Sequence, residues 1–312
     1  MASRKIPTYA VISGLCIILF EIMLFMHVKW VMYYFYMLAW WPYIFFVDGI
    51  VKYRTGTSIL TRSKRSLLSI SIWSVTIWLI FEAYNLALKN WHYIDVVSNI
   101  WIRWSGYILA FATVLPGIFE TYELLCAFNL AQNAENKPFK ITKTIETALI
   151  ITGILCLVLP VIFPRYTYPL VWGGFVFLLD PINRRLNGQS IISELSRGKP
   201  QKLIRILTSG IICGFLWEFW NYWAATKWIY TVPFVGHIKL FEMPVAGFLG
   251  FPPFAVECYC MYETLRLAGI AIDWENPPLK INNRWICSIA MQLPFWFCTF
   301  YLMDKFTVLS FH

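Results

Sequence analysis

The sequence predicts an all-α, polytopic membrane protein in which two parallel four-helix repeats are followed by one C-terminal helix. Three observations carry this prediction. Of the 312 residues, 59% are hydrophobic and 14% are charged, whereas about a quarter of the residues in a soluble domain are charged. Apolar stretches of about twenty residues, each able to span roughly 30 Å of hydrocarbon, recur along the chain. The second half of the chain also repeats motifs of the first.

Three pairs of similar segments define the repeat. FFVDGIVKYRTGTSIL, from Phe45, corresponds to FLLDPINRRLNGQSII, from Phe177. FEAYNLALKNWHY and WEFWNYWAATKWIY form the second pair, and VLPGIFETYELL and FPPFAVECYCMY form the third. Many retained residues are acids, amides and aromatics, and a retained carboxylate in an apolar segment needs an explanation other than packing. The matched positions are Asp48/Asp180, Gly56/Gly188, Ser58/Ser190, Glu82/Glu218, Asn85/Asn221, Trp91/Trp228, Tyr93/Tyr230, Pro116/Pro253, Glu120/Glu257 and Tyr122/Tyr259.

About nine spans are predicted along the chain. The first, 8–26, follows Arg4 and Lys5 and has no small-residue cleavage motif, so we expect it to remain in the protein. A first repeat occupies 1–128, a linker 129–144, a second repeat 145–267, and a loop with the terminal helix 268–312. The other predicted spans are 30–51, 67–88, 104–127, 145–163, 167–182, 203–223, 245–266 and 285–303.

The basic residues predict the orientation. With the N-terminus in the cytoplasm, 19 of the 26 Lys and Arg residues lie on the cytoplasmic side and seven lie outside, as the positive-inside rule requires. This distribution accounts for the net charge of +9 without a nucleic-acid partner. Each repeat has an even number of spans, so both enter the membrane in the same sense, around an axis along the membrane normal. The membrane is the inner membrane if the source is bacterial.

The external stretches 89–103 and 224–244 are too apolar to be flexible linkers. Each contains Trp, Tyr and a basic residue, which is typical of the membrane interface. We expect them to cap the mouth of a cavity.

The first pair of matched acids is Glu82 and Glu218. An ionised carboxylate in the bilayer is costly, so each is expected to face a cavity or a partner. Asn85 and Asn221 follow three residues later, on the same helix face. Their amides are predicted to orient the carboxylates.

The second pair, Glu120 and Glu257, follows Pro116 and Pro253 by four residues. A proline in mid-span removes a helical bond, and such a break is tolerated beside a cavity. We expect the acids to meet across the axis, Glu82 with Glu218 and Glu120 with Glu257. When two carboxyl groups share protons in a low dielectric, at least one of them stays neutral at about pH 7 and is able to donate a proton. The alternative is that these acids only hold helices together.

The other polar residues give weaker evidence about function than the matched glutamates. Asp48 and Asp180 lie at the inner ends of their spans, where a surface ion pair or a helix-end role is expected. The four His show no metal spacing, and the eight Cys resemble small apolar side chains. The chain contains no phosphate-binding loop, dinucleotide fingerprint or nucleophile elbow. We therefore expect no metal and no soluble cofactor.

Two motifs resemble those of the integral-membrane lycopene cyclases of carotenoid synthesis. ALKNWHY and ATKWIY look like that family's acid or amide followed by Trp-x-aromatic. Pro116 with Glu120, and Pro253 with Glu257, look like a variant of its proline-linked acidic motif, commonly Pro-x-Glu-Glu. The family also has tandem helical repeats. The resemblance implies a cofactor-free acid site that acts on a long isoprenoid or another lipid.

The leading hypothesis is a membrane enzyme that cyclises or isomerises an apolar, isoprenoid or carotenoid-like lipid. Glu120 and Glu257 are the favoured acids, and Glu82 and Glu218 are second acids or charge stabilisers. One alternative is a carrier of protons, ions or lipids with a midplane site between the repeats. Another is a non-catalytic assembly subunit whose partner is unknown. In the enzyme, aromatic faces would stabilise a carbocation, and the candidates are Trp78, Trp217, Trp220 and Tyr222.

Overall fold

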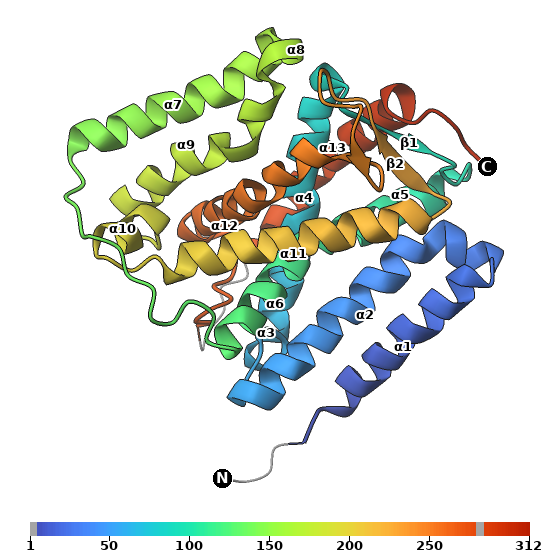
Figure 1. The fold of residues 1–312 in the computed structure, drawn as a ribbon, viewed down its shortest axis with the longest axis horizontal. Coiled ribbons are helices and arrows are strands. Elements are labelled where there is room, and N and C mark those ends of the chain that lie inside the picture. Colours follow the sequence, from blue (N-terminus) through green and yellow to red (C-terminus); the bar gives the residue numbers. More distant parts are fainter. Residues whose placement is uncertain (1–4, 279–283) are drawn as a thin grey trace.

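The computed structural model describes residues 5–278 and 284–312, and these are mostly helical (Figure 1). The first half contains α1 (Thr8–Phe25), α2 (Lys29–Thr55), α3 (Ile59–Arg62), α4 (Lys64–Leu88), α5 (Ile100–Phe111) and α6 (Val114–Ala127). The second half contains α7 (Lys143–Ile162), α8 (Pro164–Thr167), α9 (Val171–Arg185), α10 (Ile191–Ser196), α11 (Gln201–Trp223), α12 (Phe251–Leu267) and α13 (Arg284–Phe306). Two 3₁₀ helices, η1 (Tyr168–Leu170) and η2 (Val245–Gly250), precede α9 and α12.

Seven helical segments of the described residues are long and apolar enough to cross a membrane, as expected of an integral membrane protein. They are α1, α2, α4, the α5–α6 segment Ile100–Ala127, α7, α11 and α13. The helices α9 and α12, which fall in the predicted spans 167–182 and 245–266, have 15 and 17 residues and are shorter than these seven. The predicted count of nine spans is therefore not confirmed.

Local backbone features shorten these two helices. In α9, Trp172 and Gly173 have non-helical backbone angles, and Gly173 has a φ of 122°, which favours glycine. In α12, Pro252 and Pro253 lie in the first turn, where a missing N–H removes no helical bond. Pro116 likewise lies in the first turn of α6. The predicted break inside the span 104–127 is present, because the segment Ile100–Ala127 is interrupted between α5 and α6 and Pro116 lies in the first turn after the interruption. In the second half, Pro252 and Pro253 likewise follow the junction between η2 and α12.

The matched aspartates both cap short helices. Asp48 accepts hydrogen bonds from the Ser58 hydroxyl and the backbone N–H of Leu60 at the start of α3, each 3.0 Å long. Asp180 accepts from Ser190 and from backbone N–H groups at the start of α10. Both carboxylates are buried. The helix-end alternative is therefore confirmed, and the surface ion pair is wrong.

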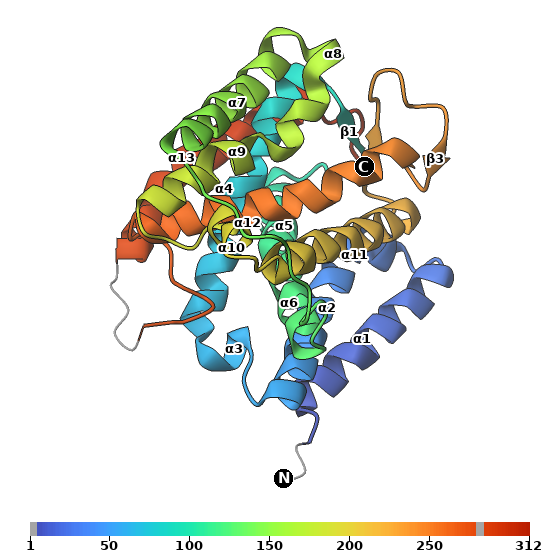
Figure 2. The ribbon, with the colours of Figure 1, turned by 60° about the vertical axis from the view of Figure 1, so that its left-hand side comes forward.

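Two short strands, β1 (Trp91–Ile94) and β2 (Lys227–Tyr230), join the halves of the chain. They pair antiparallel, so that Trp91 lies opposite Tyr230 and Tyr93 lies opposite Trp228. The end of the chain runs along the other edge of β1, where Tyr93 forms a parallel bridge with Val308. A short hairpin, β3 (Lys239–Leu240) and β4 (Met243–Pro244), follows β2 (Figure 2).

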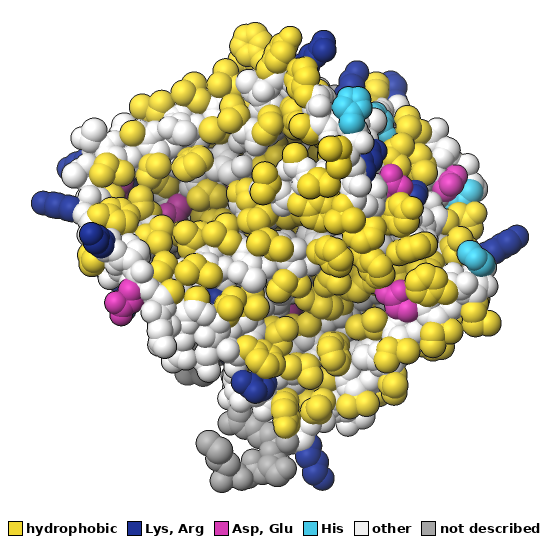
Figure 3. Space-filling view, viewed as in Figure 1, with side chains coloured by type: hydrophobic (Ala, Val, Ile, Leu, Met, Phe, Trp, Pro, Cys, Tyr) yellow, Lys and Arg dark blue, Asp and Glu magenta, His cyan; other side chains and the backbone are white. Residues whose placement is uncertain are grey.

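The outer helices present apolar surfaces. α1 packs against α2, and α7 packs against α9, side by side in both ribbon views (Figures 1 and 2). Their outward side chains are exposed, for example Leu15 at 61% and Ile151 at 53%. Hydrophobic side chains cover most of the face seen in Figure 3. An apolar surface of this extent marks contact with other molecules, and on helices long enough to cross a bilayer it fits lipid.

Candidate functional site

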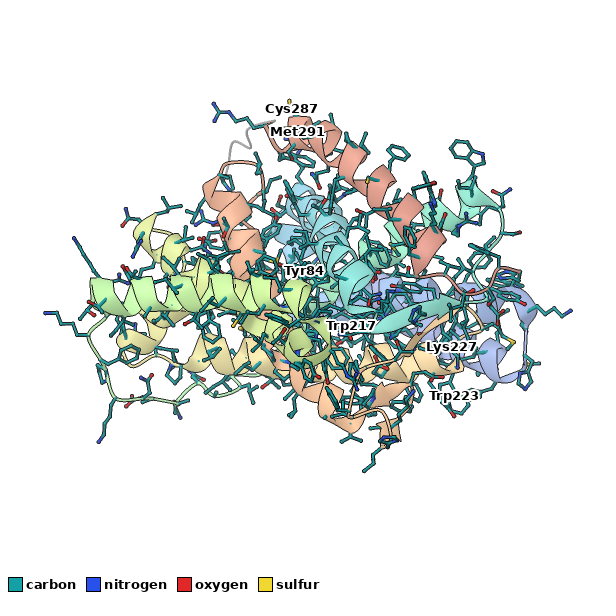
Figure 4. All side chains as sticks on the ribbon, turned by 90° about the horizontal axis from the view of Figure 1, so that it is seen from above. Tyr84, Trp217, Trp223, Lys227, Cys287 and Met291 are labelled. Atoms are coloured by element: carbon teal, nitrogen blue, oxygen red, sulfur yellow. The ribbon has the colours of Figure 1, made fainter. Side chains whose placement is uncertain are left out.

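A cavity of about 490 Å³ is bordered by β1 and β2. Its walls come from α2, α4, α5, α6, α9, α11, α12, η1, η2 and the two strands, and most lining side chains are aromatic or aliphatic. Of the lining residues labelled in Figure 4, Trp217 lies near the centre of the molecule, and Lys227 is the first residue of β2. Pockets for small molecules usually hold about 300–1,000 Å³. The cavity is therefore large enough to be a binding site.

Glu218 is the carboxylate that lines this cavity. It is fully buried on α11, and its Oε1 accepts a hydrogen bond of 2.8 Å from the Tyr230 hydroxyl. That hydroxyl accepts in turn from the indole N–H of Trp228, at 2.9 Å. Among the described residues, Glu218 Oε2 has no hydrogen-bond partner. An unsatisfied buried oxygen is costly, so Glu218 Oε2 is free either to accept a hydrogen bond from a bound molecule or, when protonated, to present its own proton to the cavity.

Glu82, the matched acid on α4, has more donors. Its Oε1 accepts from the indoles of Trp78 and Trp91, at 2.9 and 3.1 Å, and from the Tyr93 hydroxyl, at 2.5 Å. The three donors line the cavity, but Glu82 does not. Its Oε2 has no partner within the described residues. Glu82 therefore lies one side chain behind the cavity wall.

The strand pair links the two acids. Trp91 donates to Glu82 and lies directly opposite Tyr230, which donates to Glu218. Side chains directly opposite each other in an antiparallel pair lie about 5 Å apart at their Cβ atoms. The structure therefore places the two carboxylates in neighbouring hydrogen-bond networks.

The matched asparagines hold the strands rather than the carboxylates. The Asn85 amide donates to the Trp91 carbonyl and accepts from the backbone N–H groups of Asn90 and Trp91. Asn221 makes the corresponding pair of bonds to the backbone of Trp228. The predicted direct bond from amide to carboxylate is wrong, because the chain turns back after each helix and its backbone groups reach the amide. The asparagines orient the acids indirectly, by fixing the strand residues.

The two networks differ in their donors. Trp91 donates to Glu82, whereas the matched Trp228 donates to the Tyr230 hydroxyl. Trp78, which donates to Glu82, corresponds to Gly214 by the offset between Glu82 and Glu218. A Cβ atom at Gly214 would come within 2.3 Å of the Phe251 ring. A tryptophan cannot occupy this position in the second half, so Glu218 has no donor that corresponds to Trp78.

The other matched acids lie outside the cavity lining. Glu120 is fully buried on α6, and neither of its carboxylate oxygens has a hydrogen-bond partner among the described residues. Glu257, on α12, accepts a hydrogen bond of 2.9 Å from the backbone N–H of Phe175. Phe175 follows the break in α9 at Trp172 and Gly173. Glu257 thus contacts the helix that resumes after the break.

The predicted aromatic residues have different surroundings. Trp78 and Trp217 line the cavity. Trp220 is buried and donates its indole N–H to Glu21 on α1, at 2.8 Å. Tyr222 is 40% exposed and does not line the cavity. The structure therefore brings Trp78 and Trp217 together with Glu218, and places the other two aromatics elsewhere.

Two basic side chains line the cavity, and both are paired with carboxylates. Lys227 Nζ lies 2.6 Å from Glu242, and an Arg103 guanidinium nitrogen lies 2.8 Å from Asp304. Because each positive charge has a nearby negative charge, the cavity wall favours an uncharged ligand.

The strand tyrosines stay protonated donors. Burial raises the pKa of the Tyr93 and Tyr230 hydroxyls well above the ordinary value, and the neighbouring carboxylates Glu82 and Glu218 raise it further. Each hydroxyl therefore keeps its proton for the hydrogen bond to its acid.

Sequence reasoning missed the roles of several residues. Trp91, Trp228, Tyr93 and Tyr230 belong to the matched positions, but their segments were expected only to be interfacial caps. Their retention beside retained acids was the signal that could have found them. The pairing of Arg103 with Asp304 joins residues about two hundred positions apart, and no local pattern indicates it.

Comparisons of this chain with protein-family models, with curated proteins and with solved structures give no match. Within residues 5–278 and 284–312, no group of three or more His, Cys, Asp or Glu side chains is arranged to hold a metal ion.

Proposed function

We propose that this protein is an integral-membrane enzyme that isomerises or cyclises a long, uncharged, isoprenoid-like lipid by acid catalysis. The observation that carries the proposal is the position of Glu218, a buried carboxyl group with one unbonded oxygen, in the wall of an aromatic-lined cavity. The resemblance of two sequence motifs to membrane lycopene cyclases points to the same chemistry.

Glu218 is the proposed acid. In its neutral form, its carboxyl proton adds to one carbon of a carbon–carbon double bond of the ligand, which leaves a carbocation on the other carbon. The faces of Trp78, Trp217 and Trp228, which line the cavity, would stabilise this cation. Attack by a second double bond closes a ring, and loss of a proton from a neighbouring carbon to Glu218 restores the acid. Without ring closure, the same steps move a double bond.

Glu82 is assigned a supporting role. Its three donors and its position behind the wall separate it from the ligand. Tyr230 and Trp228 position Glu218, and Tyr93 and Trp91 form the matching contacts around Glu82. Glu120 and Glu257, the favoured acids of the sequence analysis, are not part of the proposed acid site because they lie outside the cavity lining.

The proposal includes the repeat architecture and the orientation. The matched pairs Trp91/Trp228 and Tyr93/Tyr230 face each other crosswise in the strand pair, which supports a twofold relation between the halves. The excess of basic residues in the loops opposite the strands supports a cytoplasmic N-terminus. The cavity would then lie in the outer half of the membrane.

The substitution Glu218→Gln tests the function, with Glu120→Gln as the matched control. Each variant would be expressed in a host that accumulates a long acyclic polyene, and the extracted lipids would be separated by chromatography. We expect Glu218→Gln to lower product at least about a hundredfold, as the loss of an essential acid does, and Glu120→Gln to retain most of it. Unchanged product from Glu218→Gln would reject the enzyme and favour a carrier or an assembly subunit.

A further inference from the structure

The cavity reaches the protein surface at two places. At the first, it is lined by Tyr33, Tyr34 and Met37 of α2 and by Ile102 and Gly106 of α5. Ile102 is 47% exposed, and a Cβ atom at Gly106 would meet nothing within 4 Å. The wall is therefore open between α2 and α5.

The second place lies between η1 and η2. Pro169 of η1 and Ala246 and Leu249 of η2 line the cavity and are exposed, Leu249 at 78%. The same cavity is also lined by the buried residues Trp91 and Trp217. The cavity is thus continuous from one exposed group to the other.

These two places correspond to each other in the sequence repeat. Met37 corresponds to Pro169 by the offset between Asp48 and Asp180. Ala110 corresponds to Gly247 by the offset between Pro116 and Pro253. All four of these corresponding residues line the cavity. Each opening therefore lies where the same two segments of one half of the chain face each other.

Both openings are bounded by specific contacts. At the first, the Trp41 indole donates to the Leu109 carbonyl at 3.1 Å, and Arg103 is fixed to Asp304. At the second, the Tyr168 hydroxyl donates to the Pro233 carbonyl at 3.2 Å. α2 and α5 are parts of candidate membrane spans. The exposed lining side chains are apolar, as expected where a wall opens to hydrocarbon rather than to water.

We infer that the cavity is a channel with two openings into the lipid, one between α2 and α5 and one between η1 and η2. An apolar chain enters from the bilayer without crossing water, and a chain longer than the cavity extends through an opening into hydrocarbon. The inference rests on the proposed function in one respect, that the ligand is an apolar lipid.

A hydrophobic photoreactive probe tests the channel without substrate or turnover. A trifluoromethyl-phenyl diazirine would be dissolved in liposomes that contain the full-length protein and then activated by light. Cleavage after Lys89 and Arg103 releases one peptide that contains Trp91, which lines the cavity, and Trp101, which is 76% exposed and does not. The ratio of adducts on Trp91 to adducts on Trp101 measures access to the interior.

The variants are Gly106→Trp, Ala246→Trp and the double variant. The matched controls, Ser105→Trp and Val245→Trp, add the same side chain at neighbouring exposed positions outside the lining. We expect each control to keep the wild-type ratio, each single variant to lower it about twofold, and the double variant to lower it about tenfold, because the added indole obstructs the opening of a cavity that otherwise admits a ligand-sized molecule. If a tryptophan variant fails to fold, Gly106→Leu and Ala246→Leu replace it.

Three results would overturn the inference. The first is a wild-type protein with no adducts on Trp91. The second is a double variant that keeps the wild-type ratio. The third is a single variant that by itself removes the adducts on Trp91, because the cavity would then have one opening. Glu218→Gln should label as the wild type does. If the wild type is labelled as expected and Glu218→Gln still forms the wild-type amount of product, the proposed function is rejected and the channel is retained.

Discussion

Glu82 and Glu218 occupy matched positions but have unequal support. Glu82 has three hydrogen-bond donors, and Trp78 supplies one of them from its own helix. Glu218 has the Tyr230 hydroxyl, which also accepts from Trp228. Removing one donor therefore has different consequences at the two acids.

Tyr230→Phe should destabilise the protein more than Tyr93→Phe. The first change leaves the Glu218 oxygen and the Trp228 indole N–H without their partner, at a cost of about 1–3 kcal/mol. The second leaves Glu82 with its two indole donors, so the expected loss is about half as large. Thermal unfolding in detergent micelles measures both variants. A larger loss for Tyr93→Phe would contradict the description of the two networks.

At the scale of elements, Asp180 shows how a buried acid can be structural. It accepts from the backbone N–H groups of Ile191 and Ile192, at 2.7 and 2.9 Å, and from the Ser190 hydroxyl, at 3.1 Å. The carboxylate thus satisfies the free N–H groups at the start of α10 and joins this helix to α9.

We expect Asp180→Asn to lower the free energy of unfolding by about 1–3 kcal/mol, because the amide NH₂ group replaces an acceptor and faces N–H donors. Glu194→Gln, on the same short helix, is the control. Glu194 pairs with Arg197 at an exposed site, and such pairs contribute about 0–1 kcal/mol. The free energies of unfolding of the two variants are measured by denaturant titration, with circular dichroism as the signal. An equal effect of the two substitutions would show that the cap contributes little.

The helices and caps could largely be predicted from the sequence, because apolar length and retained polar pairs are local properties. The choice among the four retained glutamates could not. Glu257 contacts Phe175 because α9 breaks at Trp172 and Gly173, and a glycine in an apolar segment does not reveal its backbone angles. Glu218 has no counterpart of the Trp78 donor because the ring of Phe251 lies against Gly214, a contact between different helices.

At the scale of the whole molecule, the terminal segment closes the structure around the cavity. Asp304, on α13, accepts from two nitrogens of Arg103, at 2.9 and 2.8 Å, from the Trp104 indole, at 2.9 Å, and from the Tyr107 hydroxyl, at 3.0 Å. All three donor residues belong to α5. The residues after α13 then pair with β1, through hydrogen bonds of Tyr93 to Thr307 and Leu309.

Asp304→Ala should therefore loosen α5, the terminal segment and β1 together. The substitution leaves the buried Arg103 without its carboxylate, and breaking a buried ion pair in this way costs about 3–5 kcal/mol. Trypsin should cleave faster after Lys305, which is exposed and lies next to the segment that pairs with β1. Asp95→Asn is the control, because Asp95 is exposed and touches the same terminal segment through Ser310. Cleavage at the wild-type rate in Asp304→Ala, with unchanged unfolding, would show that the terminal segment stays paired with β1 without the contact to α5.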